Sequence, residues 1–296
     1  MFTRIDHVMI CVPDLGRGIE QYTRMGFNMY PGGNHPGKGT HNAIAFNSDD
    51  YVELLAIRDP AEQRAAAGVP GTTAAGLPEF IAAGGGIRYV VVQSDDLAGD
   101  VAAMRSRRVD VSDAVDASRR TLDGKLLQWK AAVLGPRNPL SIFLIQHVTP
   151  LAERRAQLPI AGNHPNGVYA IDRAYIVTAD LEATAAIYAK VFGVAQPPLR
   201  RGTVIMADMA VFPLGSNGLA IVKPYAAGPA ADALERRGPG PFQAIYRTTS
   251  MGAAARWMEQ HGLPPAERGV RNSGEQAMLV TPANACGTYV ALVGPE

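Results

Sequence analysis

Apolar residues recur along the chain in one order, an apolar run that ends in Asp-Leu. This order appears at residues 5–15, 87–97 and 171–181, and a weaker copy begins near Pro241. Apolar runs of this length are typical of buried strands. The recurrence therefore predicts an internal repeat of four strand–helix units.

The segments after these runs predict helices, because their apolar residues recur at intervals of four and then three, which places them on one helical face. The sets are Leu15, Ile19 and Tyr22; Leu97, Val101 and Met104; Leu181, Ala185 and Tyr188; and Met251, Ala255 and Met258. Each helix is preceded by a residue whose side-chain oxygen can accept a free N–H of the first turn. These N-caps are Asp14, Asp96, Asp180 and Ser250.

Three further strands complete the first unit. Residues 40–46 and 51–57 alternate as strands do, and a shorter strand is expected over 27–30. A loop rich in Pro and Gly covers residues 31–39, and a connector over 61–86 is expected to hold one or two short helices. The first unit is therefore predicted to contain one strand, one helix and three strands.

The later units follow the same plan. The second unit has strands over 126–133 and 141–147, after a basic polar segment at 119–125. The third unit covers residues 168–224, and the fourth ends in an apolar run over 287–293.

A stretch between the second and third units is rich in prolines and charges. Residues 150–167 contain three prolines and the charged run Glu153–Arg155. Such stretches are typical of boundaries between domains. We therefore predict two domains, residues 1–150 and residues 166–296, each built from two units.

Composition limits the choice of function. With 296 residues, of which 47% are hydrophobic, the chain can bury two cores of ordinary size. A formal net charge of +1 and the lack of a dense Lys/Arg run argue against a nucleic-acid partner. No stretch approaches the ~20 apolar residues that cross a bilayer, and the first strand begins too early for a secretory signal. We expect a cytoplasmic protein without a membrane partner, in which Cys11 and Cys286 are buried free thiols.

Two ionisable residues, His7 and Glu53, interrupt apolar strands of the first unit. Burying an isolated carboxylate is costly, so Glu53 is expected to take up a proton or to find a cation. A divalent metal shared with His7 would meet that need. The alternative is a core histidine, with Glu53 paired to His7 or to an arginine such as Arg88.

Four units of this kind, paired into two domains, resemble the vicinal oxygen chelate superfamily, which includes glyoxalases, bleomycin-resistance proteins and extradiol dioxygenases. The closer similarity is to glyoxalase-like domain proteins, and it is carried by the segments 5–8, 35–43, 51–54 and 164–167. The resemblance implies an α+β fold with two tandem vicinal-oxygen-chelate-like domains. In each domain a pair of βαβββ units would form a cup-shaped mixed sheet.

The resemblance also implies a metal site. In metal-bearing members the ligands come from the first and last strands of two paired units, which here gives His7, Glu53 and Gln146. Tyr89 stands at the remaining place. Nitrogen and oxygen donors of this kind suit Zn, Fe(II), Mn or Ni, so a divalent metal is the expected cofactor.

The expected reaction is that of a lyase or isomerase acting on a small oxygenated metabolite, with Glu53 and His41 as catalytic residues. Ring-cleaving oxygen chemistry is an alternative, and it would require His41 as a second histidine ligand. A further alternative is a metal-free protein that sequesters a small molecule, as bleomycin-resistance proteins do.

Several polar and aromatic residues are candidates for substrate binding. The glycine-rich loop at 35–39 is expected to form the rim of the cup, and a solvated loop is the alternative. The basic segment at 119–125 either clamps a substrate carboxylate or is a solvated face. The candidate substrate contacts are His35, His41, Asn42, Tyr89, Arg120 and Trp129.

The second half of the chain lacks the metal ligands. Arg173 stands where the first half has His7, and Ala220 stands where it has Glu53. A guanidinium has no lone pair for coordination, so no metal is expected there. The second domain is left to cap the first cup, to form the surface of a homodimer, or to bind a small anion through Arg173.

Overall fold

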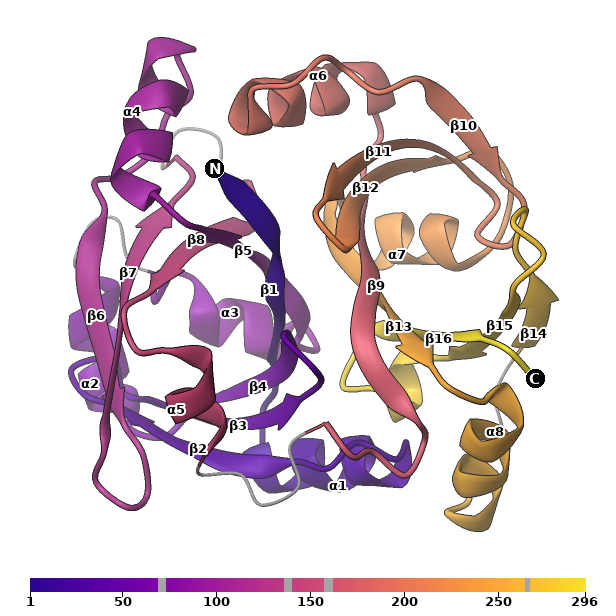
Figure 1. Cartoon of the computed structure of the whole chain (residues 1–296), viewed down its shortest axis with the longest axis horizontal. Helices are drawn as coiled ribbons and strands as arrows, with labels where there is room; N and C mark the ends of the chain where they lie inside the picture. The colour runs from indigo at the N-terminus through magenta and orange to yellow at the C-terminus, as the bar shows by residue number, and fades with distance from the viewer. Residues whose placement is uncertain (69–72, 136–139, 157–161, 264–266) are drawn as a thin grey trace.

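The computed structural model describes residues 1–68, 73–135, 140–156, 162–263 and 267–296, and two curled sheets lie side by side in it (Figure 1). The predicted boundary segment includes residues 157–161, which lie outside the described part. Each sheet has eight strands and is built from two strand–helix–strand units. The α+β fold with two tandem vicinal-oxygen-chelate-like sheets is thus confirmed.

The first sheet is a closed barrel with the strand order β1-β4-β3-β2-β6-β7-β8-β5. Its strands are β1 (Phe2–Cys11), β2 (Tyr30–His35), β3 (Thr40–Phe46), β4 (Tyr51–Ile57), β5 (Gly86–Ser94), β6 (Val115–Arg120), β7 (Leu126–Val133) and β8 (Ile142–His147). Strands β1 and β5 join the two units on one side, and the pair Asn34 and Arg120 joins β2 to β6 on the other. Closure surrounds the interior with inward-facing side chains.

The second sheet stays open, with the order β10-β11-β12-β9-β13-β16-β15-β14. Its strands are β9 (Val168–Val177), β10 (Leu199–Gly202), β11 (Ala207–Leu214), β12 (Asn217–Pro224), β13 (Gly240–Thr248), β14 (Glu267–Val270), β15 (Gln276–Val280) and β16 (Tyr289–Gly294). The edge strands β10 and β14 do not pair. Asn272 links their ends instead, with hydrogen bonds of 3.0 Å to Thr203 Oγ1 and to the carbonyl of Arg201.

The helix that follows the first strand of each unit lies on the outside of its sheet, whereas α3 (Leu77–Ala82) and α7 (Pro229–Arg237) lie within the outlines of the two sheets (Figure 1). The other helices are α1 (Leu15–Arg24), α2 (Pro60–Ala67), α4 (Leu97–Ser106), α5 (Leu151–Arg155), α6 (Leu181–Phe192), α8 (Met251–Gln260) and the 3₁₀ helix η1 (Pro282–Asn284). The predicted N-caps Asp14, Asp96, Asp180 and Ser250 each accept a backbone N–H of the first turn. Each such cap stabilises its helix by about 1 kcal/mol.

Two strand boundaries differ from the predictions. Strand β2 begins at Tyr30 and runs through most of the expected loop, because Gly33 adopts a φ of +129° that lets the chain bend while it stays paired. Strand β6 lies just before the basic segment, ends in its first two residues, and has no apolar periodicity. It is held by its pairing with β7 and β2, so its hydrophobic pattern gives no strand signal.

The first strand of each unit carries a β-bulge at the same place. On β1, Ile5 and His7 pair with the consecutive residues Val92 and Val91, which leaves Asp6 as the extra residue. The corresponding extra residues are Arg88 on β5, Asp172 on β9 and Phe242 on β13. A bulge re-aims the side chains beside it, so it decides what each first strand presents to the interior.

The two sheets share one buried core. Strands β1 and β5 of the barrel contact β9 and β13 of the second sheet, and side chains of both sheets belong to one cluster. Phe27 and Tyr246 meet edge to face at 5.2 Å between ring centroids. The second sheet therefore covers an outer wall of the barrel.

In the described ranges of the chain, no helix has the length and apolar character needed to cross a membrane.

Candidate functional site

The barrel encloses a cavity of about 320 Å³. Strand alternation decides which side chains line it, because every second residue points inward. These residues are Thr40, Asn42, Ile44 and Phe46 of β3; Tyr51, Glu53 and Leu55 of β4; and Phe143, Ile145 and His147 of β8.

His7 and Glu53 meet at the wall of this cavity. Strands β1 and β4 are parallel neighbours, and His7 Nε2 lies 3.2 Å from Glu53 Oε2. Both side chains are buried, and the ring of Tyr51 stacks on His7 with 4.3 Å between centroids. The contact is an ion pair with one side open to the cavity.

Asp6 holds two histidines from behind this pair. Because Asp6 is the extra residue of the bulge, its Oδ2 reaches Nδ1 of His7 at 2.8 Å, although the two residues are consecutive. Its Oδ1 lies 3.0 Å from Nε2 of His147 on β8. The Asp6 carboxylate is fully buried, so these two contacts replace its water.

The charges of this cluster fix its protonation state. Burial opposes ionisation of Glu53, but the hydrogen bond and charge of His7 outweigh it and lower the pKa of Glu53 to about 2. Burial also disfavours charged His7, yet Asp6 and Glu53 raise the pKa of His7 above its ordinary value. For His147, burial lowers the pKa more than Asp6 raises it. The cluster is thus a His7 imidazolium between two carboxylates, with neutral His147 beyond Asp6.

Asn42 and His35 complete the polar end of the cavity. Asn42 Nδ2 donates to Glu53 Oε1 at 2.6 Å, and a Cβ on Gly32 would collide with the Asn42 side chain. His35 Nδ1 lies 2.9 Å from Thr40 Oγ1, and burial lowers the pKa of His35 to about 4. His35 is therefore a neutral hydrogen-bonding group at pH 7.

Five of the residues predicted from the sequence line the cavity together: His7, His35, Asn42, Glu53 and Trp129. Asn42 donates a hydrogen bond to Glu53, which also contacts His7. The structure thus brings the first-strand histidine and the last-strand carboxylate into one site.

Three other predicted contacts lie elsewhere. His41 alternates with Thr40 and Asn42 on β3, so it faces away from the cavity. Arg120 is exposed and donates to the carbonyl of Gly124, while its neighbour Arg119 lines the cavity. Tyr89 packs against Phe143 and the apolar cluster that contains Met9, and it does not itself line the cavity.

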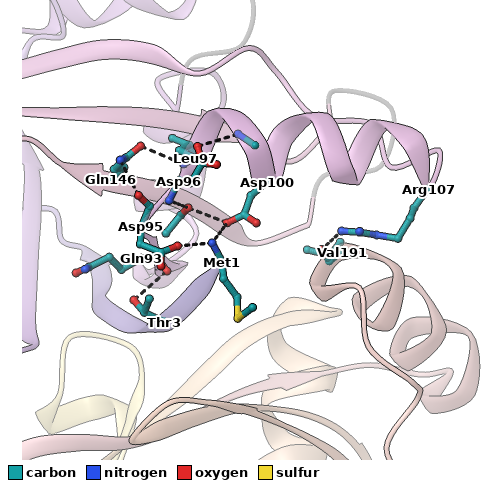
Figure 2. A network of polar contacts seen from close by, with 12 residues as sticks. Met1, Thr3, Gln93, Asp95, Asp96, Leu97, Asp100, Arg107, Gln146 and Val191 are labelled. Carbon is teal, nitrogen blue, oxygen red and sulfur yellow. Dashed lines mark hydrogen bonds and ion pairs between the residues drawn. The ribbon is translucent and has the colours of Figure 1, made fainter.

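Gln146 contacts Asp95 and Leu97 at the start of α4 (Figure 2). Its Oε1 accepts from the N–H of Leu97 and its Nε2 donates to the carbonyl of Asp95, so it caps the N-terminal turn of α4. Gln146 and His147 are consecutive on β8, and His147 is the one that faces inward. The structure therefore does not bring Gln146 to His7 and Glu53.

Sequence reasoning missed Asp6, His147 and Arg154. The signal for Asp6 was the repeated pair Ile-Asp at 5–6 and 171–172, and the signal for His147 was its alternation with Ile145. Arg154 lies in the segment between the sheets, and no pattern in the sequence places it at the cavity.

The donor set can be compared with what a divalent metal needs. A separation of 3.2 Å between His7 Nε2 and Glu53 Oε2 would suit two ligands of one ion. Protein sites for catalytic zinc supply three ligands, however, and in the described residues no three His, Cys, Asp or Glu side chains are arranged so that they could hold a metal ion. The ion pair already neutralises both groups, so these residues do not fit a metal held by the protein alone.

The second sheet repeats the carboxylate of this cluster with different partners. Asp172 takes the place of Asp6, and its oxygens pair with Arg247 at 2.5 Å and with Arg271 at 3.1 Å. Arg173 takes the place of His7, and Ala220 offers no donor. Guanidinium groups thus stand where the barrel has imidazoles.

Paired strand–helix–strand units in two curled sheets, with a polar cavity in one of them, define the vicinal oxygen chelate class. Within that class, the chain belongs to the glyoxalase-like domain family, whose model matches residues 5–192. The match covers the whole barrel together with the first strand and helix of the second sheet.

Solved structures share the fold over the full chain. A hypothetical protein from Staphylococcus aureus has a TM-score of 0.70 and 13% identity, covering 99% of this chain and 98% of its own. A mutant of 4-hydroxymandelate synthase from Streptomyces coelicolor has a TM-score of 0.67 and 12% identity. This match covers 99% of this chain and 92% of the synthase chain. At these identities the similarity shows the fold alone. No curated protein matches the sequence.

Proposed function

We propose that the cavity of the barrel is an active site of the lyase or isomerase type, which moves a proton on a small oxygenated metabolite. Glu53 is the base and His7 is the acid. The observation that carries the proposal is the 3.2 Å contact of His7 Nε2 with Glu53 Oε2 at the wall of the barrel's cavity. Perturbed acid–base pairs in such cavities are typical of catalytic sites.

The chemistry follows from the two protonation states. The ionised Glu53 carboxylate takes a proton from the carbon beside a carbonyl group, and the bonding electrons move into the carbonyl to form an enolate. The N–H at His7 Nε2 then donates to the enolate oxygen. Return of the proton to a neighbouring position gives isomerisation, and loss of a group from the next carbon gives a lyase reaction.

Substrate binding makes Glu53 a stronger base. In the free protein, His7 is the partner that most lowers the pKa of Glu53. When the substrate oxygen takes over the hydrogen bond of His7, Glu53 loses this stabilisation and its pKa rises. Asp6 keeps His7 charged and oriented throughout, since it contacts the opposite ring nitrogen.

The experiment that tests this proposal is deuterium exchange. Small 2-oxo and 3-oxo acids are incubated in D₂O with the protein, and loss of the carbon-bound proton is followed by NMR. We expect exchange above the protein-free rate for at least one compound, and no such exchange with Glu53→Gln. Equal exchange with and without protein would contradict the proposal.

A metal-free binding protein is the second candidate. It is favoured by the apolar part of the cavity, where Trp129, Phe143 and Leu77 provide a surface for sequestering a small molecule. This candidate predicts tight binding without exchange. Ring-cleaving oxygen chemistry finds less support, because His41, which it requires, faces away from Glu53.

A further inference from the structure

A buried guanidinium faces the cavity without a partner. Arg154 lies on α5, in the segment between the two sheets, and its side chain lines the cavity. It is 7% exposed, and its Nε has no hydrogen-bond partner. Within the described residues, no carboxylate pairs with it. A buried charge without a partner is strongly unfavourable, so its retention points to a ligand.

A second guanidinium lies nearby. Arg119 of β6 also lines the cavity, and its only side-chain hydrogen bond in the described chain goes to the carbonyl of Gly32. Burial lowers the pKa of Arg119, and the charge of Arg154 lowers it further. The two positive charges repel each other inside the cavity, and an anion bound between them would offset this repulsion.

Tyr51 lines the same cavity as these two arginines and the acid–base pair. Burial raises the pKa of Tyr51, and the charges of Arg154 and Arg119 both act against this rise. The ring of Tyr51 stacks on His7 at 4.3 Å. An anionic group held by the arginines therefore lies beside His7 and Glu53.

The opposite part of the cavity is apolar. It is formed by Met9, Cys11, Leu55, Leu77 and Ile145. A volume of about 320 Å³ is near the lower end for small-molecule sites, which span roughly 300–1,000 Å³. The cavity thus has Arg119 and Arg154 at one end and a largely apolar other end, where Arg88 also lines the wall and donates to the carbonyl of Ala75.

We propose that Arg119 and Arg154 bind the carboxylate of an organic acid whose apolar body fills the cavity between Leu55, Leu77 and Ile145. The inference rests on the proposed function, because it assigns the substrate class of the same site. With the carboxylate held there, the carbon beside the substrate's carbonyl group lies at Glu53, where its proton is removed. A carboxylate suits the guanidinium fork, which offers two parallel N–H donors.

The test measures binding by calorimetry with two probes of the same shape, 3-phenylpropanoate and the neutral 3-phenylpropanamide. We expect the carboxylate to bind at least about 10-fold more tightly than the amide, since charge-assisted hydrogen bonds distinguish them. Arg119→Gln and Arg154→Gln should each weaken carboxylate binding about 10-fold or more and leave amide binding unchanged. Unchanged amide binding shows that these variants are folded.

The matched control is Arg120→Gln, the neighbour of Arg119 that faces away from the cavity, and it should bind both probes as the unaltered protein does. Equal binding of the two probes, no binding of either, or arginine variants that bind the carboxylate normally would overturn the inference. A third probe, phenyl phosphate, tests whether the site prefers a carboxylate or a phosphate group. Tighter binding of phenyl phosphate than of 3-phenylpropanoate would overturn the assignment of a carboxylate.

The binding measurement and the deuterium-exchange measurement test the anion site and the proposed reaction separately. Glu53→Gln should keep carboxylate binding while it loses deuterium exchange, because Glu53 does not hold the anion. Arginine-dependent binding without exchange in the unaltered protein would overturn the proposed reaction and keep the anion site. Deuterium exchange that depends on Glu53 but is insensitive to both arginine substitutions would keep the proposed reaction and overturn the anion site.

Discussion

Asp6 Oδ2 lies 2.8 Å from His7 Nδ1, although the two residues are consecutive in one strand. A regular strand would point them to opposite faces, and the bulge at Asp6 turns both toward the acid–base cluster. The charge of His7 therefore depends on a feature of backbone pairing, and this dependence can be measured.

Replacing Asp6 by Asn should lower the pKa of His7. The change removes a carboxylate that raises this pKa, so His7 loses its proton at a lower pH. Activity requires protonated His7, so the fall in activity at alkaline pH should begin earlier. Histidine titration by NMR and the pH profile of deuterium exchange both report this shift.

The matched control is Asp172→Asn, at the same bulge position of the second sheet. Asp172 pairs with Arg247 and Arg271, so its replacement should also cost stability, about 1–3 kcal/mol. The pKa of His7 should stay unchanged. An equal shift of His7 in both variants would show that the effect is not local to Asp6.

Two buried histidines should make the protein sensitive to mild acid. Burial lowers the pKa of His35 and of His164 to about 4, from 6.5. The unfolded chain takes up these protons below pH 6.5 and the folded chain does not, so stability falls as the pH drops from 6.5 to 4. Each histidine contributes at most about 3 kcal/mol to this loss.

The pH range in which the two histidines affect stability differs from the range in which Glu53 does. The pKa of Glu53 is lowered from 4.5 to about 2, so its contribution to stability is present above pH 4.5 and is lost only below it. Urea unfolding at several pH values measures the slope. We expect His164→Asn to flatten the slope of stability against pH between pH 6.5 and 4. The same substitution at the exposed His261, His261→Asn, should leave this slope unaltered. An unchanged slope in His164→Asn would contradict the assignment.

Metal removal should have little effect on the cavity. His7 and Glu53 supply two donors, and among the described residues no third His, Cys, Asp or Glu is arranged with them so that the group could hold a metal ion. Treatment with a chelator followed by dialysis should leave deuterium exchange within about twofold, because His7 already provides the positive charge that a metal would supply. Loss of exchange that Zn, Mn, Ni or Fe restores would contradict this account and favour the metal site predicted from the sequence.

Gln146→Ala should affect stability and leave the site intact. Gln146 accepts from the N–H of Leu97 and donates to the carbonyl of Asp95 at the start of α4. Losing this cap should lower the free energy of unfolding by about 1 kcal/mol. Thermal or urea unfolding checks the loss, and deuterium exchange should be unaltered. A variant with normal stability and no exchange would place Gln146 in the active site after all.

The repeat, its helix caps and the pairing of His7 with Glu53 could be predicted from the sequence, because they depend on local pattern and on the fold of a recognisable family. The bulges could not, since a β-bulge depends on how two distant strands pair. Arg88, the extra residue of the bulge on β5, lines the cavity, whereas Tyr89 packs into the neighbouring apolar cluster. The sequence alignment of β8 was likewise off by one residue. It predicted Gln146 at the site, whereas the structure places His147 there, because neighbouring strand residues face opposite sides.

Arg154 shows a second limit. Its helix α5 belongs to the segment between the sheets, and its position at the barrel depends on tertiary packing alone. The same is true of β6, which lacks apolar periodicity and forms because β2 and β7 supply its partners. Residues placed by tertiary pairing leave little trace in a single sequence.

The most direct test of the central claim is deuterium exchange by Glu53→Gln compared with Glu79→Gln, a matched change at an exposed glutamate of α3. Glutamine keeps the shape of Glu53 and cannot accept the carbon-bound proton. The account predicts that Glu53→Gln slows exchange about 100- to 10,000-fold, while Glu79→Gln exchanges as the unaltered protein does. Undiminished exchange in Glu53→Gln would contradict the assignment of Glu53 as the base, and exchange no faster than the protein-free rate for every oxo acid tested would contradict the proposed reaction.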